Sequence, residues 1–205
     1  MNVRILPLAA LLLLAAAVSG CPWDPPIGPI EKEKEKEKLT SPEAVLRALQ
    51  KSYLDRDPAL YDSLLYDSST AMDTLSDESF SFWFADQDVQ QGEVPPSWNR
   101  FDEVESATSM LTASRVTSIQ IQLTFGPSFY DNAAGREGHK IINVTDVYLT
   151  VVDQPPEVPE ATTYLVQNQR ADFRFKVQWV DTEGDSLWRI IYWKDRGTGA
   201  GKRAS

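Results

Sequence analysis

Apolar positions recur at two different periods along the chain, and the change of period divides the predicted fold. Between residues 42 and 113, apolar side chains return every three or four positions, which is typical of helices that pack by one face. From residue 118 onward they alternate with polar side chains, which is typical of half-buried strands. Helices segregated from a run of strands predict an α+β domain, with the helices packed on one face of an antiparallel sheet.

Three helices are predicted, and each starts at a residue that can cap a helix. Ser41 and Asp57 each precede a proline, which suits the first helical turn. Asp102 and Glu105 have the spacing of a capping box. The predicted helices extend over residues 42–55, 58–66 and 102–113.

A short aromatic segment lies between the second and third helices, and four long strands follow the third. Residues 80–84 alternate Phe with Ser and Trp, which predicts a strand that is apolar on both faces. Residues 87–98 contain a glycine and two prolines and are predicted to form a loop. The predicted long strands are residues 118–125, 141–152, 164–180 and 186–194.

The chain begins with one basic residue and an apolar run from Ile5 to Val18, which is too short to span a bilayer. The run ends in Val18-Ser19-Gly20-Cys21, which resembles the lipobox of bacterial lipoproteins. The resemblance implies cleavage before Cys21 and a diacylglyceryl thioether there, with acyl chains such as palmitate. The alternative is an ordinary secretory signal that leaves a free thiol beside the cut.

These signals divide the chain into four regions. Residues 1–20 are the predicted signal peptide, and residues 21–40 are a proline-rich and Glu/Lys spacer with no apolar face to bury. Residues 22–40 reach at most about 60 Å when fully extended. Residues 41–196 form the predicted domain, and residues 197–205 are predicted to be a disordered tail.

Composition limits the classes of partner. The chain has 30 acidic and 20 basic residues and a net charge of −10, which argues against nucleic acid and against adhesion to anionic lipid heads. The membrane contact expected here is therefore the lipid on Cys21 alone. The expected localisation is the bacterial cell envelope, on the periplasmic or outer-membrane side. Pro22 stands where an aspartate can mean inner-membrane retention, so the outer membrane is favoured.

The order of the predicted elements, together with the tryptophan-rich segment 188–193, resembles the nuclear-transport-factor-2-like (NTF2-like) family over residues 41–196. This resemblance implies three N-terminal helices packed on a strongly curved, mainly antiparallel sheet that forms a cone. The open end of the cone often holds a small apolar ligand. Family members include isomerases, dehydratases, cyclases, transport factors and proteins without known activity.

Candidate chemistry is sparse. The single histidine, His139, lies at a loop-to-strand junction and is predicted to be a surface residue. One histidine and an acylated Cys21 cannot form a metal site, and no acidic series at calcium-loop spacing is recognised, so neither metal nor cofactor is expected. Asp146 and Tyr148 are the best catalytic candidates, as proton acceptor and oxyanion donor on one strand face. The alternative is that this face is simply the solvent side.

An aromatic set could line a ligand pocket, or could fill the cone or a dimer interface. Its members are Tyr61, Trp83, Trp179, Trp188 and Tyr192. The last strand is apolar on both faces, which suggests that a second copy or an envelope protein covers the sheet.

The sequence therefore favours a membrane-anchored envelope lipoprotein whose domain binds or assembles rather than catalyses. The alternative is a small-molecule enzyme or carrier that uses the cone.

Overall fold

The computed structural model describes residues 38–72, 78–92, 94–157 and 160–197. These residues belong to one compact unit, which extends from Glu37 to Ser205. The predicted signal peptide, the lipobox, all of the spacer before Lys38 and the tail after Gly197 lie outside the described residues.

Two capped helices open the described part of the chain. α2 (Pro42–Asp55) begins where the Oγ of Ser41 accepts a hydrogen bond from the backbone N–H of Ala44. α3 (Pro58–Leu64) begins in the same way, with Asp57 accepting from Leu60. These bonds satisfy backbone donors that a helix start leaves without partners, and both predicted helix starts are confirmed.

The next two helices differ from the prediction. α5 (Arg100–Thr112) is capped by Asn99, and Asp102 completes the capping box from inside the helix, so the predicted box of Asp102 and Glu105 is wrong. The predicted loop contains a short helix, α4 (Asp86–Gln90), and a strand, β2 (Ser97–Asn99). The described residues thus form four helices, of which only two precede the first strand, and not three N-terminal helices.

The described strands form one curved sheet in the order β2-β1-β7-β6-β5-β3, and β4 pairs with β5 beside this path. Every pairing is antiparallel except that of β1 with β7, so the mainly antiparallel sheet is confirmed. The remaining strands are β1 (Ser81–Trp83), β3 (Val116–Phe125), β4 (Phe129–Tyr130), β5 (Lys140–Asp153), β6 (Thr162–Val180) and β7 (Ser186–Asp195).

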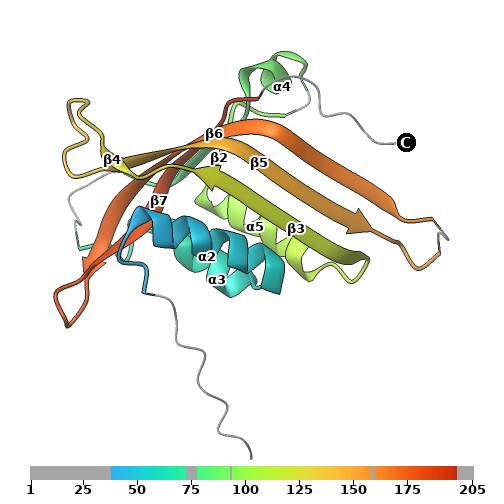
Figure 1. Ribbon diagram of the computed structural model, residues 1–205, viewed down its shortest axis with the longest axis horizontal. Helices are drawn as coiled ribbons and strands as arrows, with labels where there is room; N and C mark the ends of the chain where they lie inside the picture. The colour runs from blue at the N-terminus through green and yellow to red at the C-terminus, as the bar shows by residue number, and fades with distance from the viewer. Residues whose placement is uncertain (1–37, 73–77, 93, 158–159, 198–205) are drawn as a thin grey trace, which may run out of the picture. The chain divides into compact units, whose positions relative to one another are not determined.

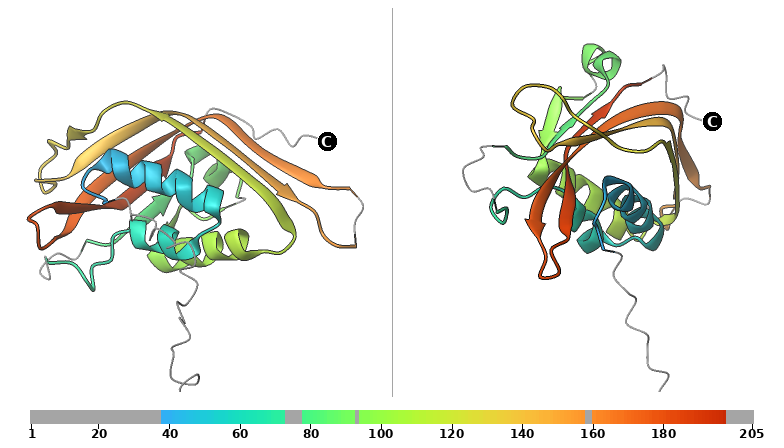
Figure 2. Two further views of the ribbon diagram at one scale, coloured as in Figure 1. Left: turned by 60° about the horizontal axis from the view of Figure 1, so that its bottom comes forward. Right: turned by 60° about the vertical axis from the view of Figure 1, so that its left-hand side comes forward.

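The sheet arches over α2, α3 and α5, while α4 lies apart from them (Figure 1). The same three helices stay inside the arch in both further views (Figure 2). Register shifts interrupt β5 between Val144 and Val147, and they interrupt the pairing of β6 with β7 at two places. Such bulges bend strands, which accounts for the curvature of the sheet.

Large side chains from the sheet and the helices fill the inner face of the arch. The aromatic and aliphatic residues with at most 1% exposure there include Tyr61, Phe173, Phe175, Ile142 and Ile190. Leu39 joins this core and accepts a backbone hydrogen bond from Trp188 at 2.9 Å, so the end of the predicted spacer packs with the domain. Within the described ranges, no helix is long and apolar enough to cross a membrane.

Candidate functional site

Asp146 and Tyr148 lie on the outer face of the sheet, away from the helices. The shift in β5 turns Val147 and Leu149 toward the core, so the residues that alternate with them face outward. Tyr148 pairs with Gln122 on β3 and is 40% exposed. Both candidates therefore lie on the face opposite the core, where Tyr148 is exposed, whereas Asp146 is half-buried and its Oδ1 is buried without a hydrogen-bond partner among the described residues.

The five aromatic candidates do not meet at one site. Tyr61 and Trp188 belong to the inner core, and Trp83 is exposed beside β2. Trp179 and Tyr192 stack against cations, with the guanidinium carbons of Arg189 and Arg174 at 4.5 and 4.6 Å from their ring centres. The five side chains therefore lie in three different environments: the core, an exposed position beside β2, and contacts with arginine.

Two tyrosines and two carboxyl groups come together inside the arch. Tyr61 on α3 donates a hydrogen bond to Oε1 of Glu103 in the first turn of α5. The ring of Tyr53, from the last turn of α2, meets that of Tyr61 edge-on, with 5.6 Å between their centres. Asp195 ends β7 opposite Ala171, a fully buried residue on the inner face, so its carboxyl group approaches the same region. Four elements therefore contribute to one buried cluster, called here the Tyr–carboxyl cluster.

Burial dominates the electrostatics of the Tyr–carboxyl cluster. Glu103 is 7% exposed, and this burial raises the pKa of its carboxyl group, an effect that the hydrogen bond from Tyr61 opposes. Burial raises the pKa of Asp195 to about 6, although Trp193 acts to lower this pKa. It also raises the pKa values of Tyr53 and Tyr61 above their ordinary range. The cluster thus holds protons more tightly than the same groups in water.

The sequence analysis missed Glu103, although a signal exists. Glu103, Ala107 and Leu111 follow one another at intervals of four residues, and all three are buried. An acidic residue on the apolar stripe of a helix must find a partner when it is buried. That partner, Tyr61, lies 42 residues away in the sequence.

His139 is buried, so its prediction as a surface residue is wrong. It is 3% exposed, and its Nε2 lies 3.3 Å from the carboxylate of Glu78. Burial lowers its pKa, and Lys176 and Arg174 act in the same direction, while Glu78 opposes them. The imidazole therefore lies buried among charged side chains, which include Glu78, Lys176 and Arg174.

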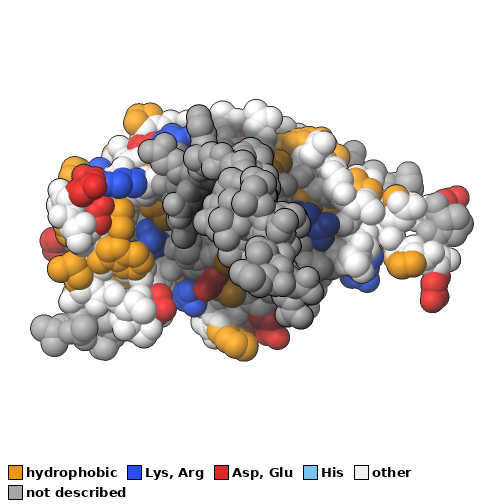
Figure 3. Space-filling model, turned by 90° about the horizontal axis from the view of Figure 1, so that it is seen from below, with side chains coloured by type: hydrophobic (Ala, Val, Ile, Leu, Met, Phe, Trp, Pro, Cys, Tyr) orange, Lys and Arg blue, Asp and Glu red, His pale blue; other side chains and the backbone are white. Residues whose placement is uncertain are grey.

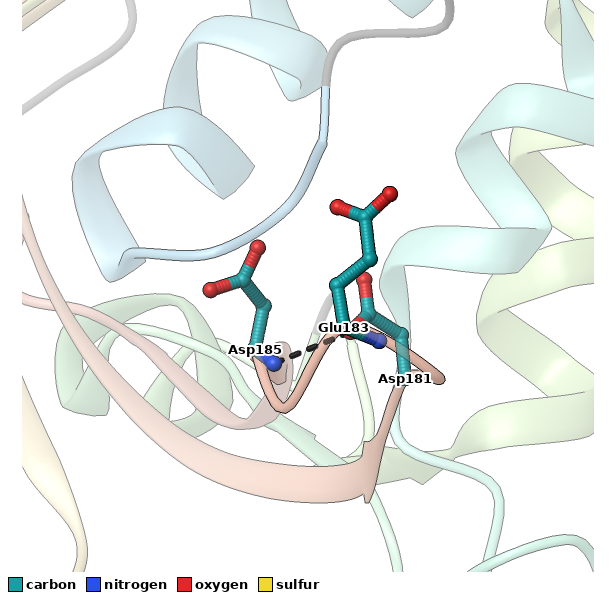
Figure 4. A group of neighbouring side chains, drawn as sticks. All are labelled: Asp181, Glu183 and Asp185. Atoms are coloured by element: carbon teal, nitrogen blue, oxygen red, sulfur yellow. Dashed lines mark hydrogen bonds between the residues drawn. The ribbon is translucent and has the colours of Figure 1, made fainter.

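An acidic trio lies at the tip of the hairpin between β6 and β7 (Figure 4). Asp181, Glu183 and Asp185 project from one turn, and Asp181 accepts the backbone N–H groups of the other two at 2.9 Å. Their ligand atoms lie within 4.8 Å of one another, a spacing that the sequence analysis did not recognise. Lys38 pairs with all three, at 3.5 Å from Asp181 and 3.6 Å from Asp185. The trio is therefore already neutralised in part by the lysine that leads into α2.

A half-open groove of about 260 Å³ lies beside β1 and α4. It is mainly apolar and is lined by Trp83, Phe84, Asp86, Val89, Gln90 and Pro96.

Viewed from below, the molecule carries acidic and basic side chains next to one another at its left-hand end, with hydrophobic side chains nearby (Figure 3). The visible part of that face shows no continuous basic surface.

No protein-family model matches the chain, and no curated protein matches it. Among solved structures it is similar to a proposed dehydratase of the NTF2-like family from Streptomyces avermitilis, with 10% identity and a TM-score of 0.49 over 77% of this chain and 94% of that one. A proposed scytalone dehydratase from Novosphingobium aromaticivorans gives 8% identity and a TM-score of 0.46 over 80% and 86% of the two chains. An NTF2-like protein of unknown function in nutrient uptake from Rhodospirillum rubrum gives 14% and 0.39 over 74% and 93%.

These likenesses concern the fold alone. The structures from Streptomyces avermitilis and Rhodospirillum rubrum carry the name of the family that the sequence resembles, and the activities named for these structures belong to those proteins. The chemistry available in this chain is read from its own groups. A buried carboxyl group with a raised pKa, hydrogen-bonded to a tyrosine, can exchange a proton with a neighbouring group. The side chains that pack around it leave it enclosed by the core.

Proposed function

We propose that this protein is a membrane-anchored lipoprotein whose domain binds or assembles with other molecules of the cell envelope. The single observation that carries the non-catalytic part is the filled interior of the arch. Tyr61, Phe173 and Phe175 are almost entirely buried at the position where a cone-shaped domain would otherwise keep space for a ligand. Close packing of this kind stabilises a domain and leaves its outer surfaces for recognition.

The anchor rests on the sequence Val18-Ser19-Gly20-Cys21 and on the absence of any second cysteine that could pair with Cys21. Two acyl chains on that thiol give stable membrane attachment, because each buried CH₂ contributes about 0.8 kcal/mol. The spacer would then hold the domain away from the bilayer surface.

Mass analysis of the native protein tests this anchor. We expect a chain that starts at Cys21 and carries the mass of the acyl groups. The Cys21→Ser variant should move from the membrane fraction to the soluble fraction, while a Ser19→Ala control should remain with the membrane. A mature chain with an unmodified Cys21, or one that retains residues 1–20, would contradict the proposal.

Recognition through the sheet is the proposed mode of binding, either with a second copy of this chain or with another envelope protein. The outer face carries Tyr148 among polar side chains, and β3 forms an edge of the sheet whose outer-facing residues are mostly polar. Light scattering on the purified protein separates the two partners. A dimer that is lost in a Tyr148→Lys variant supports self-association, whereas a monomer at high concentration leaves only a different protein as partner.

Small-molecule chemistry is the second candidate function. Its candidate site would be the Tyr–carboxyl cluster rather than Asp146 and Tyr148. Glu103 and Asp195 have raised pKa values and lie inside the arch, where a proton donor or acceptor would be needed. Native mass spectrometry of the purified protein tests this reading. A co-purifying small molecule that is absent from Glu103→Gln would support it, and the same ligand-free mass for both proteins would favour the binding domain.

A further inference from the structure

The free edge of β3 carries backbone groups that no neighbouring strand uses. β3 is the last strand of the sheet path and pairs on one side only, with β5. Successive residues of an antiparallel strand direct their N–H and C=O groups to opposite sides. The carbonyl oxygen of Thr124 points toward β5, because it accepts a hydrogen bond from the hydroxyl group of Thr145 at 3.1 Å.

The register between β3 and β5 is unbroken from Ser118 to Thr124. Leu123 therefore directs its backbone groups away from β5, and Ile121 and Ile119 do the same. The N–H and C=O groups of Ile119 and Ile121 are called here the open edge.

Side chains of α2 and of its C-cap residue occupy the two ends of this strand edge. Oε1 of Gln50 accepts the backbone N–H of Leu123 at 2.7 Å. At the other end, Nη1 of Arg56 donates to the carbonyl oxygen of Val116 at 2.6 Å. Between these two contacts, no residue of the described ranges forms a hydrogen bond with the open edge.

α2 lies alongside β3 without closing the space next to it (Figure 1). Gln50 and Leu54 are four residues apart, so they lie on the same side of the helix. Leu54 is 55% exposed. The side of α2 that meets β3 at Gln50 is therefore open to solvent one turn later, toward Arg56.

The open edge is also free of charge. β3 has the sequence VTSIQIQLTF, which contains no ionisable side chain, although the whole chain has a net charge of −10. Natural proteins usually protect such edges with charged side chains or prolines. Two acidic copies repel one another, and an uncharged strand is where they can approach without placing like charges opposite each other.

A second copy of β3 matches the open edge about a two-fold axis through Gln120. In an antiparallel pair with this register, Ile119 of each copy faces Ile121 of the other, and the two residues exchange both of their N–H···O bonds. Gln120 faces its own copy on the outer side of the sheet. The contacts of Gln50 and Arg56 end the ladder on either side, so this self-complementary pairing closes after two copies.

We propose that two copies of this protein pair in antiparallel fashion through the open edge of β3, which joins their sheets into one. The pairing rests on the proposed function, whose recognition through the sheet it narrows to one edge and to a second copy as the partner. Backbone hydrogen bonds provide most of the contact and little surface is buried. We therefore expect a dimer that dissociates on dilution.

Sedimentation equilibrium of the full chain carrying Cys21→Ser tests for this dimer in the absence of acylation. Gln120 is exposed, so substitutions there leave the core unchanged. Gln120→Glu and Gln120→Lys should each weaken the dimer about tenfold or more, because like charges then face each other across the axis. An equimolar mixture of the two variants should restore the dimer, because opposite charges then meet.

Gln122 provides the matched control. It is exposed on the same face of β3, but in the proposed register it faces Ser118 of the other copy and not its own copy. Gln122→Glu and Gln122→Lys should therefore weaken the dimer much less than the substitutions at Gln120. Their mixture should form no more dimer than either variant alone.

Cysteine substitution tests the register in the full chain. Residues that face each other at a non-hydrogen-bonded position have Cα atoms about 4.5 Å apart, which a disulfide can bridge. Gln120→Cys should therefore form a covalent dimer when an oxidant is added. Gln122→Cys should not, because the two copies of residue 122 would lie about 13 Å apart along the ladder. The unsubstituted chain, which retains Cys21, is the blank.

The possible failures are distinguishable. A monomer at every concentration would overturn the pairing and leave a different protein as the partner in the proposed function. A dimer that persists in Gln120→Glu but is lost in Tyr148→Lys would also overturn the pairing, while it would support recognition through the outer face. Assemblies larger than two copies would contradict the closed pair. A mature chain with an unmodified Cys21 would contradict the membrane anchor and leave the pairing intact.

Discussion

At the scale of single residues, the protein places ionisable groups where their charge is expensive. Glu103 and Asp195 lie inside the arch, and the hydrogen bond from Tyr61 is the described contact that offsets the burial of Glu103. The balance at each of these groups therefore depends on one or two neighbours. Substitutions at these neighbours should have effects well above the usual range for surface positions.

Removal of the Tyr61 hydroxyl group should destabilise the fold. Tyr61→Phe keeps the ring in the core and leaves the buried carboxylate of Glu103 without its donor, so we expect a loss of about 1–3 kcal/mol in the free energy of unfolding at pH 7. Urea denaturation measures this. Tyr148→Phe is the matched control on the outer face and should stay within about 0.5 kcal/mol of the original protein.

Asp195 should make the protein less stable as the pH rises from about 4 to about 6. Its pKa is about 6 in the folded state and about 3.8 when unfolded, so between these values the folded protein binds more protons than the unfolded chain. The loss of folding free energy is absent below the pKa of the unfolded state and complete above the pKa of the folded state. It amounts to about 3 kcal/mol at most.

Asp195→Asn provides the measurement for that group. The difference in unfolding free energy between the variant and the original protein should grow in favour of the variant from pH 4 to pH 7. A difference that stays constant over this range would show that the carboxyl group titrates normally in the folded state. The charge of Asp195 also raises the pKa of Glu103, so the Asn variant removes that contribution as well, and both effects favour the variant as the pH rises.

At the scale of elements, local capping determines where the helices begin, and the residue that caps can differ from the one a motif suggests. Two starts follow the pattern of a capping residue before proline. The third does not, because Asn99 occupies the cap and Asp102 has the inner position of the box. Asp-x-x-Glu and Asn-x-x-Asp overlap by one residue here, and the sequence offers both.

Substitution separates these two capping boxes. Asn99→Ala removes the acceptor for the backbone N–H of Asp102 and should cost about 1 kcal/mol, within a usual span of about 0.5–2 kcal/mol. Glu105→Ala lies on the exposed side of α5 and should cost less than about 0.5 kcal/mol. Equal losses in thermal or urea unfolding would contradict the observed cap.

At the scale of the whole molecule, the described residues form a unit with its own core. The main core cluster contains residues from Leu39 to Ile190, and a smaller cluster of Tyr66, Ala71 and Ile191 lies apart from it. The compact unit begins at Glu37. Stability should therefore depend on where the chain is cut near this point.

Two truncated chains test this boundary. A chain that starts at Lys38 should unfold within about 0.5 kcal/mol of one that starts at Cys21, because both retain the core. A chain that starts at Thr40 loses the Leu39 side chain and the acceptor for Trp188, and we expect it to be less stable by about 2 kcal/mol. The urea midpoints of the three chains test both expectations. Equal midpoints for the chains that start at Lys38 and at Thr40 would place Leu39 outside the core.

Part of the fold could be predicted because its signals are local. The helix from Pro42 to Asp55 was predicted at its observed bounds. Its capping residue and its proline are neighbours in the sequence, and its apolar residues recur every three or four positions. The long antiparallel strands follow from alternation in the same way. The short elements α4 and β2 have no such pattern, and β2 exists only because β1 lies beside it.

The candidate site could not be predicted because long-range contacts create it. The bulges in β5 decide which face Asp146 and Tyr148 occupy, and a shift of one residue moves a side chain from the core to solvent. Glu103 meets Tyr61 only when α3 and α5 pack against the same face of the sheet. The sequence by itself determined the caps of α2 and α3, the alternation of the long strands and the lipobox pattern, because each depends on neighbours along the chain. The tertiary structure alone decided which carboxyl groups are buried and which groups they meet, since burial and pairing depend on residues that only folding brings together.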